Sequence, residues 1–162
     1  MAKNDVQLIG TAGGVSIPTY RYKTELNTTV INPGEPCKIS ATDREYAVIL
    51  ADAEPIDGTT TNFLGVAATA STQTASADGE VYLHKPVAGL IYACKAKSAA
   101  AADTQAEIDE IIGDQILFDL TGTTFTVDTA TAHNANNGCV IVGGDPARSV
   151  IYFTMLASST NQ

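Results

Sequence analysis

The chain has 162 residues, with 9 Lys plus Arg against 18 Asp plus Glu, so its formal net charge is −9. This length is enough for one ordinary domain with a buried core, and the acidic balance argues against a nucleic-acid-binding protein, which would show a basic face. Hydrophobic residues make up 44% and charged residues 17% of the chain, which excludes the composition of disordered proteins. The polar residues include much Thr, Ser and Asn, which favours an all-β fold.

The first 32 residues are predicted to form an extended N-terminal arm or strands, separate from a β-barrel domain over residues 33–162. Two strand-like pieces, 6–9 and 15–22, are separated by the small-residue stretch 10–14. Pro18 is expected at an edge or a bend, because proline cannot donate a hydrogen bond within a central strand. The arm is a candidate for strand addition to a neighbouring molecule.

From residue 33 onward, short β-type runs alternate with turn signals, which is typical of a small antiparallel β-barrel or sandwich of about nine to eleven strands. The runs are 36–40, 46–50, 63–69, 80–85, 90–97, 115–120, 123–127, 139–142 and 149–156. The turn signals include Asp57-Gly58, Asp78-Gly79, Asn137-Gly138 and the stretch 143–146. This pattern is compatible with one barrel or with two fused half-barrels.

One short helix is predicted near residues 104–112. Thr104 and Glu107 have the spacing of a capping box, and Gly113 can end the helix. Ile108, Ile111 and Ile112 are expected on one helical face. The alanines of 99–102 either extend this helix or form a small-residue linker.

Candidate catalytic side chains are few, and no catalytic, cofactor-binding or metal-binding residue is predicted. His84 is expected on the polar face of a strand and His133 in a loop. Three widely spaced cysteines form no metal-binding or redox pair, and we interpret them as buried free thiols that act as small hydrophobic residues. They are Cys37, Cys94 and Cys139.

Two groups of carboxylates are candidate ligand sites. The first precedes Gly58 and lacks the regular alternation of a calcium loop, so a solvated turn is predicted; it consists of Asp52, Glu54 and Asp57. The second is predicted to form the exposed face of the helix; it consists of Asp103, Glu107, Asp109, Glu110 and Asp114.

No apolar run approaches the roughly 18 residues of a membrane span, and the N-terminus lacks the apolar stretch of a signal peptide. We therefore expect synthesis in the cytoplasm, with no membrane partner.

The order of these features over residues 32–156 resembles the small head-decoration, or cement, proteins of tailed bacteriophages. The resemblance rests on a Pro-Gly-Glu opening before a strand, a Leu-Gly-Val-Ala strand, an Asp-Gly-Glu-Val strand and two closing strands. The eight segments that carry the resemblance, these among them, are 33–39, 46–52, 63–68, 77–83, 88–96, 112–119, 137–142 and 149–156. The stretches 69–77 and 98–112 are longer than in that pattern, and residues 1–32 have no clear counterpart.

The resemblance implies a structural protein, not an enzyme, that binds the outside of an icosahedral capsid as a homotrimer and bridges neighbouring capsomers. Its partners would be the major capsid protein and its own copies, with no nucleic acid and no cofactor, and it would lie on the outer surface of the virion. Candidate contacts on the arm are Val6, Leu8, Ile9, Ile17, Tyr20 and Tyr22.

Two other functions remain open from the sequence. The chain could be another β-module of a virion, such as a tail, fibre-base or adhesin part that binds a surface glycan through its turn-rich loops. An enzyme that uses one of the thiols would instead lose activity when Cys37, Cys94 or Cys139 is replaced.

Overall fold

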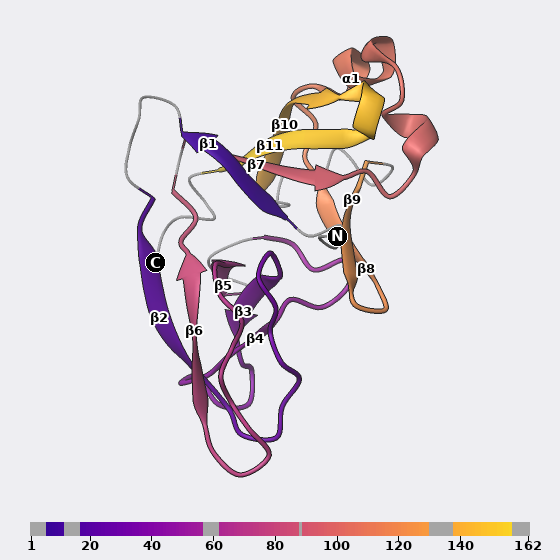
Figure 1. Cartoon of the computed structure of the whole chain (residues 1–162). Coiled ribbons are helices and arrows are strands. Elements are labelled where there is room, and N and C mark those ends of the chain that lie inside the picture. Colours follow the sequence, from indigo (N-terminus) through magenta and orange to yellow (C-terminus); the bar gives the residue numbers. More distant parts are fainter. Residues whose placement is uncertain (1–5, 12–16, 57–61, 88, 130–137, 157–162) are drawn as a thin grey trace.

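The structure is a computed structural model that describes residues 6–11, 17–56, 62–87, 89–129 and 138–156. Within these residues the chain forms eleven strands, one α-helix and two short 3-10 turns (Figure 1). The predicted all-β fold with one helix is confirmed. The nine strands predicted after residue 33 are all present, with ends shifted by a few residues.

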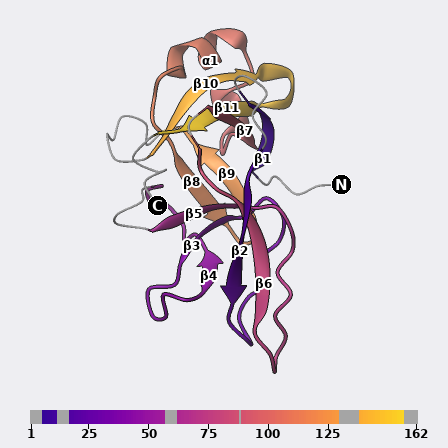
Figure 2. The same cartoon turned by 90° about the vertical axis from the view of Figure 1, so that its left-hand side faces the viewer.

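Two antiparallel sheets and one hairpin make up the fold (Figures 1 and 2). The first sheet has the order β1 (Gln7–Thr11), β7 (Leu90–Lys95), β11 (Val150–Met155), β10 (Cys139–Asp145). The second has the order β2 (Thr19–Thr24), β6 (Gly79–His84), β5 (Phe63–Ala67), β3 (Pro36–Ile39), β4 (Ala47–Ile49). The hairpin consists of β8 (Leu117–Thr121) and β9 (Thr124–Asp128).

The barrel is not closed by hydrogen-bonded ladders. Among the described residues, only an isolated bridge between Lys23 and Tyr46 connects β4 back to β2. The molecule is therefore a small sandwich with open strand edges, and β1 and β2 each form an outer edge of their sheet.

The N-terminal segment supplies one strand to each sheet. The structure starts β1 one residue and β2 four residues later than the strand-like pieces at 6–9 and 15–22. Val6, with 2% of its surface exposed, and Ile31 are buried in the core. In the isolated chain the described part of residues 1–32 is thus integral to the fold, and its role as an arm that reaches a neighbour stays a prediction.

Buried side chains gather in two clusters, a larger one between the two sheets and the hairpin and a smaller one around the second sheet. The larger one contains the aromatic residues Tyr92, Phe118, Phe125 and Phe153. The Phe118 and Phe153 rings lie 5.6 Å apart edge to face, a favourable aromatic geometry. The smaller cluster is built on Ile31, Cys37, Ala47, Leu64, Ala67, Val81 and Leu83. Ile49 packs against both clusters and so connects the two halves of the core.

The predicted helix is present as α1 (Gln105–Ile111), and its capping box is confirmed. The Thr104 hydroxyl accepts a hydrogen bond from the Glu107 amide, and the Glu107 carboxylate accepts one from the Thr104 amide. The preceding alanines form a 3-10 turn, Ala99–Ala101. The expectation for Ile112 is wrong: the helix ends at Ile111, the backbone turns extended, and Ile112 is 49% exposed.

The predicted turn at 143–146 is also wrong, because β10 continues to Asp145 through a bulge between Ile141 and Gly143. The chain turns only after β10 has ended, in the 3-10 turn Pro146–Arg148. Gly144 allows this arrangement. A Cβ atom there would lie 2.6 Å from the carbonyl oxygen of Val150 and 2.9 Å from Cδ1 of Ile108. The absence of a side chain lets α1 pack directly on β10.

We therefore expect Gly144→Ala to destabilise the protein by about 1–3 kcal/mol, since the methyl group overpacks the contact between α1 and β10. Val142→Thr, at an exposed position of the same strand, should change stability by less than about 0.5 kcal/mol. Urea denaturation followed by circular dichroism measures both. Equal stability of Gly144→Ala and the wild type would show that this contact is not tight.

Candidate interaction surface and cavity

The described thiols and histidine do not form a reactive site. Cys37, Cys94 and Cys139 are buried, as predicted. Burial raises the pKa of the Cys37 and Cys139 thiols, so both are protonated at neutral pH. His84 is half-buried, which lowers its pKa; His133 lies outside the described residues.

The prediction of a solvated turn before Gly58 holds in part: Asp52 is exposed and lies in a turn, whereas Glu54 is half-buried. Asp52 accepts a hydrogen bond from the Leu120 amide at 2.8 Å, and Glu54 pairs with Lys38 and accepts from the Ala51 amide at 2.7 Å. Asp57 lies outside the described residues. Through Asp52, this loop contacts the distant hairpin.

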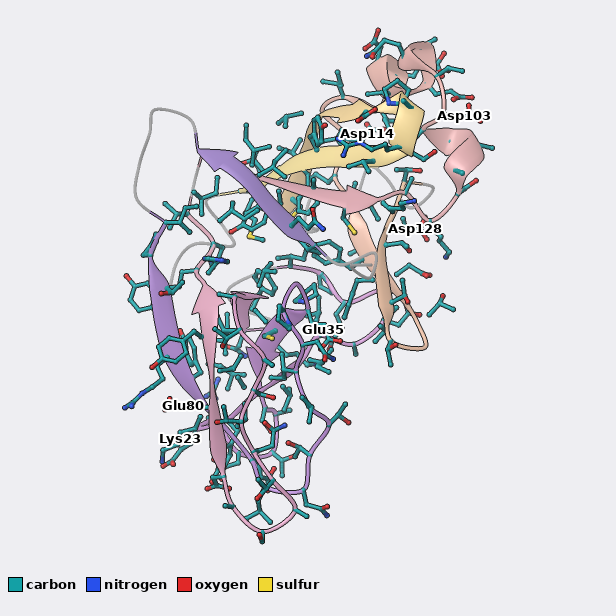
Figure 3. All side chains as sticks on the ribbon, viewed as in Figure 1. Lys23, Glu35, Glu80, Asp103, Asp114 and Asp128 are labelled. Atoms are coloured by element: carbon teal, nitrogen blue, oxygen red, sulfur yellow. The ribbon has the colours of Figure 1, made fainter. Side chains whose placement is uncertain are left out.

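The described residues contain no group of three or more His, Cys, Asp or Glu side chains that could hold a metal ion. The described acidic residues near α1, including Asp103 and Asp114, lie at one end of the molecule (Figure 3). Asp103 is exposed as predicted, whereas Glu107 and Asp114 are half-buried. Within the described part of the chain, no helix has the length and apolar character needed to cross a bilayer.

A first candidate surface is the flank where the chain passes between the sheets, which we call the β1–β2 flank. β1 pairs with β7 and β2 pairs with β6, so the first two strands of the chain each add an outer edge to one of two strands, β6 and β7, that also follow each other (Figure 1). Five of the large exposed apolar residues lie on the strands and connections of this flank: Ile9, Ile17, Tyr20, Tyr82 and Val87. Tyr20 and Tyr82 lie on opposite faces of the β2–β6 pair, because Tyr20 is opposite Leu83 and Tyr82 is opposite Arg21. Exposed apolar groups around open strand edges are typical of protein-binding surfaces.

Only half of the six candidate contact residues belong to this surface. Ile9 and Tyr20 are 49% and 45% exposed, and Ile17 is also exposed. Val6 is buried, while Leu8 and Tyr22 are partly buried against the core clusters. Composition alone does not distinguish these cases, because the strand register decides which apolar side chain faces inward.

The six contact residues predicted from the sequence include neither Tyr82 nor Val87. Tyr82 lies between the buried residues Val81 and Leu83, and this alternation is the signal that places it on the outer face. In the sheet Tyr82 lies opposite Arg21, which forms an ion pair with Glu80 at 3.4 Å. On the other face, the Lys85 ammonium lies 4.6 Å from the centre of the Tyr20 ring, a cation–π contact.

A second candidate site is a cavity of about 440 Å³ between β4 and the tip of the β8–β9 hairpin. Its lining consists of Thr28, Thr29, Val30, Asn32, Glu35, residues 47–51, Leu120, Gly122, Thr123 and Phe125. The wall at 28–32 is held by the polar segment that follows β5. Gln73 donates to the carbonyl of Thr29 at 3.0 Å, and Ser71 accepts from the amide of Ile31 at 2.8 Å.

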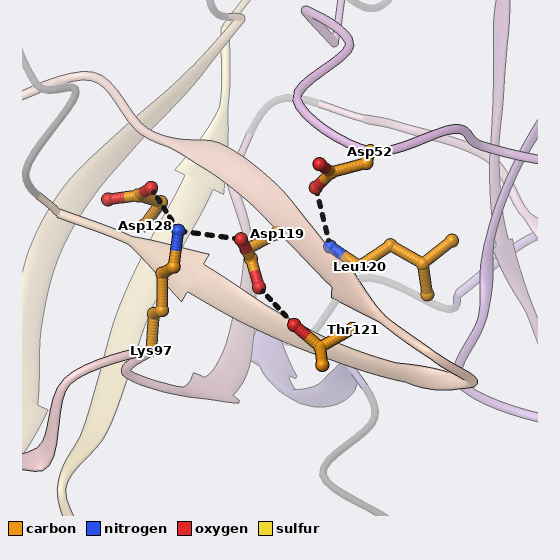
Figure 4. A network of polar contacts seen from close by, with 6 residues as sticks. All are labelled: Asp52, Lys97, Asp119, Leu120, Thr121 and Asp128. Atoms are coloured by element: carbon orange, nitrogen blue, oxygen red, sulfur yellow. Dashed lines mark hydrogen bonds and ion pairs between the residues drawn. The ribbon is translucent and has the colours of Figure 1, made fainter.

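The opposite wall is the hairpin, which a polar network holds in place (Figure 4). The Lys97 ammonium pairs with Asp119 on β8 at 2.7 Å and with Asp128 on β9 at 3.0 Å. Asp119 also accepts from the hydroxyl of Thr121 at 2.9 Å. Together with the bond from Leu120 to Asp52, these contacts fix the hairpin on both sides.

Comparison of the chain with protein-family models, with curated proteins and with solved structures finds no match.

The hairpin network predicts a specific pH dependence. The hydrogen bond from Lys97 holds the pKa of Asp119 below its usual range, so the stability that this carboxylate contributes is present at neutral pH and lost as the pH falls through its depressed pKa. We expect Lys97→Met to lower Tm at pH 7 by about 2 °C and to flatten the fall of Tm between about pH 5 and pH 2.

Thermal unfolding at a series of pH values measures this effect. Lys95→Met removes the same charge from an exposed position at the end of β7. This control should show the same fall of Tm at acidic pH as the wild type. If the Tm of Lys97→Met fell at acidic pH as steeply as that of the wild type, the assigned role of the network would be contradicted.

Proposed function

We propose that this chain is a structural virion protein that binds the outside of an icosahedral phage capsid and stabilises it by bridging neighbouring capsomers. The observation that carries the proposal is the β1–β2 flank, where two open strand edges lie beside exposed apolar side chains, among them Ile9 on β1 and Tyr82 on β6. Such edges can accept an extended segment of a partner by strand addition. The sequence motifs occur in an order that resembles cement proteins, and this resemblance suggests the capsid as the partner.

The charge of the chain is consistent with an outer position. A net charge of −9 is repelled by packaged nucleic acid, so the exterior of a shell suits this protein better than its lumen. In this proposal the chain is made in the host cytoplasm and acts there as a homotrimer that joins assembling particles. Many copies on one shell give avidity, so that each single contact can be weak.

The flank is better tested by point substitutions than by deletion of residues 1–32. Deletion would remove β1, β2 and the buried side chains of Val6 and Ile31, and loss of binding would then follow from unfolding. Ile9 and Tyr82 are exposed, so charged side chains at these positions disturb a partner more than they disturb the core.

The double variant Ile9→Glu with Tyr82→Glu should bind capsids that lack this protein at least about tenfold more weakly than the wild type, because each carboxylate is desolvated at the contact. Ile112→Glu, equally exposed but beside α1, should bind within about twofold of the wild type. Co-sedimentation with purified capsids measures binding, and circular dichroism confirms folding.

Two results would contradict the proposal: a wild-type chain that does not sediment with capsids, or flank variants that bind as tightly as the wild type. Saturable binding of the isolated protein to a glycan array, together with no binding to capsids, would favour an adhesin module instead.

A further inference from the structure

The cavity beside the hairpin meets the outer edge of a strand. β4 is the last strand of the second sheet, and its three residues, Ala47, Val48 and Ile49, all line the cavity. Side chains of successive strand residues point to opposite faces of a sheet. A cavity lined by all three therefore runs along the edge of β4 and not under one of its faces.

The register of β4 shows which backbone groups reach this edge. The Leu50 amide donates to the carbonyl of Pro36, and the Ser40 amide donates to the carbonyl of Tyr46, both at 2.8 Å. The even-numbered residues of this segment thus direct their backbone groups toward β3, and in an antiparallel pair the odd-numbered residues direct theirs the other way. The bridge to Lys23 lies at the start of β4, so the end near Ile49 is where a further strand can pair.

A buried carboxylate lies in the same cavity lining. Glu35 has only 2% of its surface exposed, and its two oxygens accept hydrogen bonds from the backbone amide of Asn32 at 2.7 Å and from its side-chain amide at 3.1 Å. A carboxylate can accept about four hydrogen bonds. Within the described ranges no Lys or Arg pairs with Glu35, and the lining contains neither residue type.

The remaining lining suits the stem of a long basic side chain. Leu50, Leu120 and Phe125 supply apolar wall, and Thr123 and Gly122 form the hairpin tip beside it. Lys and Arg bury their methylene groups along apolar surface while the charged head takes a polar partner. A cation beside a buried carboxylate also offsets the cost of burying that charge.

We propose that this cavity binds an extended segment of a partner polypeptide, which pairs with the outer edge of β4 near Ile49 and places a Lys or Arg side chain against Glu35. The strand edge selects a polypeptide, and the carboxylate selects its basic residue. The site uses no residue of the β1–β2 flank, so it stands independently of a role on a capsid.

The test is a titration of the isotope-labelled, full-length protein, followed by NMR, with three probes. The first is an acetylated and amidated pentapeptide, Ser-Val-Lys-Val-Thr, whose β-branched residues favour an extended conformation. The second replaces its Lys by norleucine, and the third is n-butylammonium chloride. We expect saturable shifts of the amide signals of Ile49, Leu120 and Gly122 with the Lys peptide, and about tenfold weaker binding of each other probe.

Two variants locate the binding. Glu35→Gln removes the charge and should weaken the Lys peptide about tenfold while leaving the norleucine peptide within about twofold. Ala51→Trp fills the cavity from an exposed lining position and should abolish the shifts of the amide signals. This second variant keeps the test valid if Glu35→Gln does not fold. Glu110→Gln, an exposed acid on α1, is the control for the lost charge and should bind like the wild type.

Four outcomes would overturn the proposal. They are no saturable shift around the cavity, equal affinity for the Lys and norleucine peptides, unchanged binding by Glu35→Gln or Ala51→Trp, and binding of butylammonium as tight as that of the Lys peptide. The last result would assign a pocket for small amines instead of a strand-binding site.

Discussion

The docking of the β8–β9 hairpin between the two sheets is the contact on which the rest of the molecule depends. Phe118 and Phe125 bring the hairpin into the larger core cluster, and an isolated bridge joins Val127 to Ala96, just after β7. On the other side, Ala53 donates its amide to the carbonyl of Phe118 at 3.1 Å, and Asp52 accepts from Leu120. A two-stranded hairpin is marginal alone, so these contacts give it a fixed position.

That position creates one of the two candidate binding regions, because the hairpin tip forms a wall of the cavity at the edge of β4. The other region, the β1–β2 flank, follows from the strand order, which leaves β1 and β2 at the outer edges of their sheets. The two regions offer the same kind of group to a partner, namely the unpaired edge of a strand. They differ in what surrounds it: exposed apolar and aromatic side chains on the flank, and a buried carboxylate in the cavity.

Local signals in the sequence predicted the elements of the fold but not their partners. Turn residues and runs of β-formers located the strands, and the spacing of Thr104 and Glu107 located the helix, because these signals depend on neighbouring residues. The continuation of β10 past Gly143 could not be read, since it depends on the packing of Ile108 against Gly144. The cavity was missed for the same reason: Glu35 and Gly122 meet only through tertiary docking.

The most direct test of the central claim, that the chain binds the outside of a shell through the β1–β2 flank, is an electron-microscopy reconstruction of particles purified from cells that produce the chain. The account predicts density for this protein on the exterior, bridging capsomers, with β2 and β6 facing the shell. Density at a tail or inside the shell, particles without the chain, or a bound chain whose flank faces solvent would contradict it.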